Sequence, residues 1–235
     1  MSLQSDGGSM ESLRILEIKK SVFQGNDERA AVLRAELRKD KLFLLNLMSS
    51  PGSGKTTTLV RTIEALKGEM SIGILEADID SDVDARTVAE AGAKAIQLHT
   101  GGMCHLDAEM TRQGLAGLGT EGLDIVFLEN VGNLICPADF DTGASRNAMI
   151  LSVPEGDDKP LKYPRIFEIV DAVLVNKIDA ASFFDFDMAA LRERVMRLNK
   201  KARIIPISAK TGEGIGEWAD WIRAEVEGWR RDAWR

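Results

Sequence analysis

The sequence places a cysteine directly beside a histidine, at Cys104 and His105. Both residue types are rare in this chain, which has two cysteines and two histidines in total. The other cysteine, Cys136, lies in the stretch Asn-Leu-Ile-Cys-Pro. Two thiolates and an imidazole suit Zn²⁺ or Ni²⁺, and coordination geometry rather than raw affinity decides between these metals. Because buried cysteines are also common apolar fillers, a metal site and ordinary core packing are both open interpretations of these residues.

A second group of chemically distinctive residues is the stretch Ser-Ser-Pro-Gly-Ser-Gly-Lys-Thr-Thr, residues 49–57. It ends in the Gly-Lys-Thr of a phosphate-binding P-loop, whose glycines let backbone N–H groups turn toward phosphate oxygens. Ser49 stands where the pattern has its first glycine, a position that tolerates other residues if the backbone torsion is ordinary. A glycine-rich turn without a ligand is the alternative, and the apolar run before it and the helical pattern after it argue against that. The residues predicted to bind the nucleotide here are Gly52, Ser53, Gly54, Lys55, Thr56 and Thr57.

Acidic residues after two further apolar runs predict the hydrolytic part of such a site. Asp78 and Asp80 follow the first run, and Glu129 and Gly132 follow the second, in Glu-Asn-Val-Gly. The usual motif is Asp-x-x-Gly, in which the carboxylate reaches Mg²⁺ and the glycine N–H senses the γ-phosphate, so glutamate preserves the charge. No glutamine is near to orient the attacking water, so we expect slow hydrolysis of GTP. Asp78 or Asp80 is the candidate to position that water. The alternative interpretation of Asp78 and Asp80 is that they lie in an ordinary solvated loop. The predicted catalytic residues are Lys55, Asp78, Asp80, Glu129 and Gly132, and the predicted Mg²⁺ ligands are Thr56, Asp78 and Glu129.

Two later motifs identify the base of the nucleotide. In Asn-Lys-Ile-Asp, residues 176–179, the Asp179 carboxylate can accept two hydrogen bonds from guanine, whereas adenine offers no matching donors. Asn176 is expected to tie loops together and Lys177 to lie over the base. In Ser-Ala-Lys, residues 208–210, a backbone N–H can meet the guanine O6. Their order after the P-loop favours a GTPase over a P-loop kinase, which would normally bind adenine; the predicted base-binding residues are Asn176, Lys177, Asp179, Ser208, Ala209 and Lys210.

Alternating apolar runs and helical patterns predict the elements that position these residues. They indicate an α/β fold, a doubly wound and mostly parallel sheet with helices on both faces, of the P-loop NTPase type. The stretch 137–164 breaks this alternation and holds one apolar piece at 148–153. The predicted strands are 42–48, 72–75, 95–98, 125–128, 172–175 and 204–207. The predicted helices are 26–39, 57–66, 84–91, 106–118, 188–198 and 215–226.

Both cysteines follow predicted strands, so they belong to the sheet edge where nucleotides bind in parallel folds. If those two strands are neighbours, Cys104, His105 and Cys136 converge. The fold prediction thus makes a metal site possible without excluding a structural role for the cysteines.

Composition sets the outer limits of the interpretation. A net charge of −7 with dispersed basic residues argues against nucleic-acid binding. We expect no disulfide framework and no membrane span, and therefore a cytoplasmic protein. Residues 1–25 are expected to be a flexible arm or a cloning remnant, residues 26–40 an N-terminal helix with Asn26 and Asp27 as possible caps, and residues 41–235 the P-loop GTPase domain.

Taken together, the stretches 49–57, 100–110 and 129–141 resemble the hydrogenase nickel-incorporation GTPases of the HypB family. The resemblance runs from about Leu42 to about Trp221. It implies a signal-recognition-like (SIMIBI) GTPase fold, a GTP-promoted homodimer, and a metal cluster for Ni²⁺ or Zn²⁺ at the dimer interface that maps onto Cys104, His105 and Cys136. Some relatives have a further histidine where this chain has Glu109. The chain has neither the cysteine-rich nickel motif nor the histidine-rich tract that other members have.

The resemblance implies a GTP-hydrolysing metallochaperone that delivers nickel during [NiFe]-hydrogenase maturation. Its implied cofactors are GTP or GDP, Mg²⁺ and the cluster metal, and its implied partners are nickel-delivery proteins and the hydrogenase large subunit. Two alternatives remain open from the residues. One is a GTPase chaperone for another metalloenzyme, such as urease or a cobalamin-dependent mutase. The other is a regulatory GTPase whose cysteines are structural.

Overall fold

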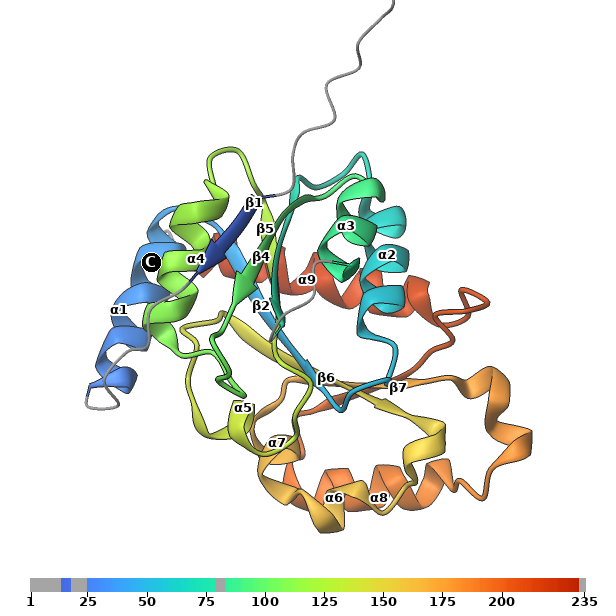
Figure 1. Ribbon diagram of the computed structural model, residues 1–235. Coiled ribbons are helices and arrows are strands. Elements are labelled where there is room, and N and C mark those ends of the chain that lie inside the picture. The colour runs from blue at the N-terminus through green and yellow to red at the C-terminus, as the bar shows by residue number, and fades with distance from the viewer. Residues whose placement is uncertain (1–13, 18–24, 79–82, 233–235) are drawn as a thin grey trace, which may run out of the picture.

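The computed structural model describes residues 14–17, 25–78 and 83–232, which form one sheet covered by helices (Figure 1). The described strands make an eight-stranded sheet in the order β1-β4-β3-β5-β2-β6-β7-β8, and every neighbouring pair is parallel. The strands are β1 (Arg14–Glu17), β2 (Phe43–Ser49), β3 (Ile72–Asp78), β4 (Lys94–His99), β5 (Ile125–Glu129), β6 (Arg146–Ser152), β7 (Ala172–Asn176) and β8 (Arg203–Pro206).

Helices cover both faces of this sheet. The α-helices are α1 (Asn26–Lys39), α2 (Lys55–Leu66), α3 (Val83–Glu90), α4 (Ala108–Leu118), α5 (Cys136–Asp139), α6 (Lys159–Lys162), α7 (Pro164–Ile169), α8 (Met188–Leu198) and α9 (Ile215–Asp232). Helix α1 packs beside α4, whereas α2 packs with α3 and α9 (Figure 1). The predicted doubly wound parallel fold is therefore confirmed.

Side-chain alternation along β3 shows how the layers are built. A Cβ at Gly73 would lie 2.8 Å from the Leu118 side chain of α4, so Gly73 faces α4. Successive strand residues point to opposite faces, so Ile72, Ile74 and Glu76 face the α2 and α3 side. Buried aliphatic and aromatic side chains fill both layers, which leaves the loops after the strands to provide polar chemistry.

Outside the motifs the structure differs from the sequence prediction in several places, including the short helices α6 and α7, which the sequence patterns do not predict. Residues 148–152 of the apolar piece belong to the inner strand β6, which the strand–helix alternation does not predict because the β5–β6 connection contains only the four-residue helix α5 and has no helical period. The expected arm at 1–25 includes β1, which pairs with β4. Neither Asn26 nor Asp27 caps α1; the N-cap is Gly25, with φ 86° and no side-chain cap bond.

Two tryptophans fix α9, the last helix. The Trp218 indole N–H donates to Thr62 Oγ1 of α2 at 3.0 Å, and the Trp229 indole N–H donates to the Leu42 carbonyl at 3.0 Å. Trp218 also stacks on Trp221, with ring centroids 5.1 Å apart. Buried indoles that find hydrogen-bond partners pack without an unsatisfied donor, so α9 is held at both ends. None of the described helices combines the length and apolar character of a membrane span.

Gly214 is the last residue of the loop between β8 and α9, and it passes close to the backbone of Pro206. Its φ is 75°, and an added Cβ would lie 2.1 Å from the Pro206 carbonyl oxygen. We expect Gly214→Ala to lower the free energy of unfolding by about 3 kcal/mol, because left-handed backbone strain and overpacking add.

Gly228, inside α9, is the matched control because a Cβ there would meet nothing within 4 Å. Gly228→Ala should raise stability by about 0.5–1 kcal/mol through helix propensity. Urea denaturation of both variants checks the pair, and equal effects of the two substitutions would contradict this account of the turn.

Candidate functional site

The P-loop connects β2 to α2 and has the backbone that phosphate binding requires. Gly52 and Gly54 take left-handed torsions, with φ 74° and 97°. Ser49 is the buried last residue of β2 and is not among the described residues with positive φ, so its substitution for glycine costs no backbone strain. Ser53 Oγ is buried and makes no hydrogen bond within the described part of the chain. Phosphate oxygens are the acceptors that such a hydroxyl and the α2 N-terminus fit.

The Asn176 side chain joins three loops. Its Nδ2 donates to the Ser53 carbonyl at 2.8 Å, and its Oδ1 accepts from the backbone N–H of Lys177 at 2.8 Å and of Ala209 at 3.0 Å. A Cβ at Gly54 would lie 2.5 Å from Asn176 Nδ2, so only glycine leaves room for this amide. The expected role of Asn176 in tying the loops together is confirmed.

The other base-motif residues lie around this junction. Lys177 takes a left-handed torsion, with φ 65°, and its Nζ donates to the Gly52 carbonyl at 2.7 Å. The Ser208 hydroxyl donates to Asp179 Oδ1 at 2.7 Å, while Asp179 is otherwise exposed. The structure thus brings the P-loop and both base motifs together and leaves a carboxylate oriented by a serine at their edge. Lys210, by contrast, has an exposed side chain.

Arg61 of α2 is a site residue that the sequence did not reveal. Its Nε donates to the Ala209 carbonyl at 3.1 Å, and one terminal nitrogen donates to the Lys210 carbonyl at 3.3 Å. Another terminal nitrogen pairs with Glu64 at 3.0 Å. The guanidinium therefore fixes the backbone of the Ser-Ala-Lys loop. Because its partners there are main-chain oxygens, which every residue has, no sequence signal identifies this role.

The acidic residues lie at the carboxyl edge of β3 and β5. Glu129 ends β5 with 1% exposure and is in register with Leu47 of β2 and Glu76 of β3. Asp78 is the last residue of β3, and Asp80 lies outside the described residues. Thr56 lies in the first turn of α2, the helix that follows the P-loop. These hydroxyl and carboxylate oxygens have the hard-donor chemistry that Mg²⁺ prefers, so the residues fit the ion.

The segment after β5 contacts the P-loop. A Cβ at Gly132 would lie 3.1–3.3 Å from three atoms of Pro51, so the two backbones approach closely. Asn130 anchors the start of this segment, because its backbone N–H donates to the Leu47 carbonyl and its Nδ2 to Asn46 Oδ1, at 3.0 and 3.1 Å. Four residues beyond Gly132 the chain enters α5 at Cys136.

The two cysteines meet although their strands are not neighbours. Strand β3 lies between β4 and β5, so the condition we set for convergence is wrong. The loops nevertheless extend far enough for the Cys136 side chain to lie close to the Cys104 thiol and raise its pKa. Cys104 Sγ also lies 3.9 Å from His105 Nδ1. The three predicted ligands therefore come from two segments that touch at one place.

The protonation states at this contact follow from burial. The pKa of the Cys104 thiol is raised, first by its hydrogen bond with Cys136 and then by desolvation. The pKa of His105 is lowered by desolvation, which favours the neutral imidazole that a metal needs. His105 is 4% exposed and stacks on Phe140, with ring centroids 3.6 Å apart. Metal binding would have to displace the thiol protons.

Within one protomer the described residues contain no group of three or more histidine, cysteine or acidic side chains placed to hold a metal. Glu109, at the position of the histidine in some relatives, accepts a hydrogen bond from Gln113 of the same helix at 3.2 Å.

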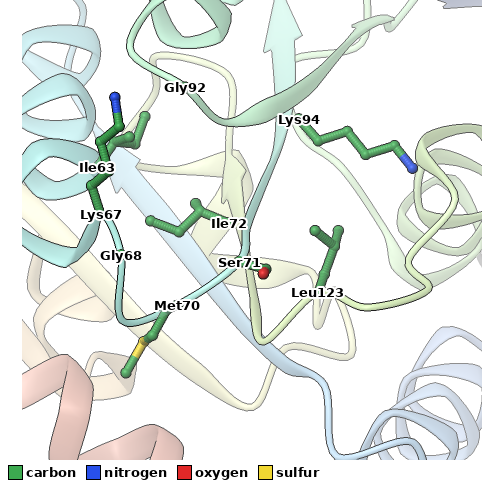
Figure 2. A pocket seen from close by; sticks show the side chains of 9 residues that line it. All are labelled: Ile63, Lys67, Gly68, Met70, Ser71, Ile72, Gly92, Lys94 and Leu123. Atoms are coloured by element: carbon green, nitrogen blue, oxygen red, sulfur yellow. The ribbon is translucent and has the colours of Figure 1, made fainter.

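A separate cavity of 320 Å³ lies at the opposite edge of the sheet (Figure 2). Its lining includes Lys67, Ile72 and Lys94, at the end of α2 and the starts of β3 and β4. The loops that hold the predicted site residues lie at the other end of these strands, so this cavity is not part of the candidate site.

Comparisons with known proteins agree with this geometry. The sequence matches the family described as CobW/HypB/UreG, nucleotide-binding domain, over residues 43–206. It is 45% identical over 212 residues to the hydrogenase maturation factor HypB of Azotobacter vinelandii, covering 90% of this chain and 70% of that protein. It is 39% identical over 211 residues to the hydrogenase/urease maturation factor HypB of Helicobacter hepaticus, covering 88% and 86%.

Solved structures give the same result. The HypB of Helicobacter pylori in complex with nickel superposes with a TM-score of 0.82 at 35% identity, covering 87% of this chain and 96% of that one. The 54 kDa signal recognition particle protein of Aeropyrum pernix in complex with GDP shares the fold, with a TM-score of 0.56 at 16% identity, covering 88% and 54%. The resemblance inferred from the motifs is confirmed: the chain belongs to the HypB family of hydrogenase maturation factors, within the CobW/HypB/UreG group of nucleotide-binding domains.

Proposed function

We propose that this protein hydrolyses GTP to GDP and phosphate and uses the cycle to deliver nickel during [NiFe]-hydrogenase maturation. The observation that carries the proposal is the contact between the Cys104–His105 loop and the Cys136–Phe140 segment, where His105 stacks on Phe140. The similar HypB of Helicobacter pylori has been crystallised in complex with nickel. Membership of the HypB family supports the hydrogenase as recipient.

In the proposed nucleotide site the guanine lies against the Asp179 carboxylate and the loop 208–210. The Ala209 N–H donates to Asn176 Oδ1 in the structure, so a contact with guanine O6 requires this N–H to be shared between the two oxygens or released from Asn176. Lys55 and the glycines of the P-loop hold the phosphates. Mg²⁺, when bound, supplies positive charge that offsets the charge developing on the phosphates, and Thr56, Asp78 and Glu129 would hold it. Asp78 and Asp80 are the candidates to position the attacking water.

The proposed coupling runs through the segment from Gly132 to Cys136. Gly132 lies against the P-loop, where its N–H can sense the γ-phosphate, and Cys136 is four residues further along. Loops that bind the γ-phosphate order around it and relax after hydrolysis. Hydrolysis can therefore shift one thiol of the cluster relative to the other.

We propose that a second copy of the chain completes the metal site. One protomer's described residues bring two thiols and an imidazole close without forming a full ligand set, whereas a two-fold related copy would double these donors. GTP would favour this homodimer, and Ni²⁺ or Zn²⁺ would lie at its interface. Nickel-delivery proteins and the hydrogenase large subunit would be the exchange partners.

A second recipient deserves a test because the Helicobacter hepaticus relative is named a hydrogenase/urease maturation factor. The same site could load urease with nickel. Activation assays with purified apo-hydrogenase and apo-urease distinguish the two recipients. A regulatory GTPase with structural cysteines would activate neither enzyme.

Arg61 should act on guanine recognition, because it fixes the carbonyls of Ala209 and Lys210. We expect Arg61→Ala to weaken GDP binding about tenfold, since lost support of one good hydrogen bond is worth on the order of 1–1.5 kcal/mol. IDP lacks the exocyclic amine of guanine but keeps O6. Arg61→Ala should lower the affinity for IDP by the same factor as for GDP, because O6 is the atom that the loop 208–210 is expected to contact. Fluorescence titrations of the two nucleotides measure both effects, and Glu64→Ala, which breaks only the arginine's other ion pair, is the control. Unchanged GDP affinity in Arg61→Ala would contradict this role.

Cys104→Ala separates the metallochaperone from the regulatory interpretation. We expect nickel binding to fall at least about 100-fold, because one of few soft donors is lost, while GTP turnover without nickel stays within about twofold, since Cys104 touches no predicted nucleotide ligand. Equilibrium dialysis with Ni²⁺ and a phosphate-release assay give the two values. Cys136→Ala should repeat the nickel result. Normal nickel binding by both variants would favour structural cysteines.

A further inference from the structure

The Asn26 side chain bridges the two segments that hold the predicted metal ligands. Its Oδ1 accepts from the backbone N–H of Ala108 at 3.0 Å, and its Nδ2 donates to the Asp141 carbonyl at 3.0 Å. Ala108 is three residues past His105, and Asp141 is five residues past Cys136. A single amide at the start of α1 therefore joins both segments.

The rest of α1 strengthens the bridge on the Asp141 side. Arg34 Nε donates to the Ala144 carbonyl at 2.8 Å, and a terminal nitrogen of Arg34 pairs with Asp141 at 2.5 Å. Leu33 packs on Gly143, where an added Cβ would lie 2.8 Å from a Leu33 methyl carbon. The segment 141–144 is thus held against α1 by a hydrogen bond, an ion pair and an apolar contact.

The same helix is attached to the other segment through α4. Glu36 of α1 pairs with Arg112 of α4, and the two helices lie side by side (Figure 1). Helix α4 begins three residues after His105, and the buried Asp107 caps it by accepting from the Met110 N–H at 2.9 Å. Helix α1 therefore spans both segments along its length.

Across this junction the predicted ligands make their own contacts. His105 stacks on Phe140, the residue before Asp141, and the Cys136 side chain lies close enough to the Cys104 thiol to raise its pKa. The Asn26 bridge runs alongside these two contacts, from the chain just after His105 to the chain just after Phe140. Any change in its length would move the thiol of Cys136 relative to the Cys104–His105 pair.

We propose that Asn26 is a positioning residue for the metal: it sets the spacing between the Cys104–His105 loop and the Cys136 segment. The inference rests on the proposed metal site and adds a residue from a helix outside the nucleotide motifs. Both of its hydrogen bonds go to main-chain atoms of the two metal-ligand segments. Groups that orient metal ligands typically change metal affinity 10- to 100-fold when removed.

The test compares nickel and GDP binding of Asn26→Ala, Asn26→Asp and Glu28→Ala in the full chain. Asn26→Ala removes both hydrogen bonds, and Asn26→Asp keeps the acceptor for Ala108 but loses the donor to Asp141. Glu28 is exposed in the same turn of α1 and serves as the control. The readouts are the Ni²⁺ dissociation constant, the nickel–thiolate absorption band and the GDP dissociation constant.

We expect Asn26→Ala to lower the nickel affinity about tenfold and to alter the nickel–thiolate absorption band. The nickel affinity of Asn26→Asp should lie between those of Asn26→Ala and the parent. GDP affinity should stay unchanged in all three variants. Arg34→Gln, which breaks the second link to Asp141, should weaken nickel in the same way if Asn26→Ala fails to fold. Parent-like nickel binding and spectrum in Asn26→Ala, or a parallel loss of nickel and GDP, would overturn the proposal.

Failure of the underlying metal site has a different signature. In that case Cys104→Ala would bind nickel like the parent, whatever the Asn26 variants do. Loss of nickel in Cys104→Ala together with parent-like binding in Asn26→Ala would leave the site intact and refute only the positioning role.

Discussion

The Asn176 amide holds together three loops that are distant in sequence, and the proposed nucleotide site depends on this junction. Its hydrogen bonds reach the P-loop carbonyl of Ser53 and the backbone N–H groups of Lys177 and Ala209. A buried side-chain amide with satisfied donors and acceptors is both stabilising and geometrically demanding. Gly54 is constrained by it, since any Cβ there would displace the amide. The residues predicted to bind the phosphates and those predicted to bind the base are therefore joined in one hydrogen-bonded unit.

The segment 130–140 lies against this unit and contacts both the P-loop region and the Cys104–His105 loop. Asn130 and Gly132 join it to the P-loop strand and to Pro51, and Cys136 and Phe140 join it to Cys104 and His105. A ligand shifts a conformational equilibrium only if it interacts differently with the two states. Because both the γ-phosphate and a thiolate-bound metal would contact this segment, each can bias its position, and the two effects must be reciprocal.

The sequence predicted those parts of the site in which side-chain type and spacing define the chemistry. The P-loop, the Asn176 junction and the parallel sheet with its nucleotide edge fall into this class. Asn26 and Arg61 do not, because they act on main-chain carbonyls and N–H groups that carry no residue signature. Strand β6 has no signature of this kind because its connection holds only α5. The predicted approach of Cys104 to Cys136 assumes neighbouring strands, although β3 separates them. The length and path of the two loops bring Cys104 and Cys136 together, and these properties leave no periodic pattern in a sequence.

The most direct test of the account is the nickel affinity of the protein saturated with GDP, compared with its affinity when saturated with a non-hydrolysable GTP analogue. Coupling through the segment from Gly132 to Cys136 predicts tighter nickel binding with the analogue, by about tenfold or more, which corresponds to about 1.4 kcal/mol of coupling free energy. Equal nickel affinities in the two nucleotide states would contradict the claim that the nucleotide and the thiols share one moving element.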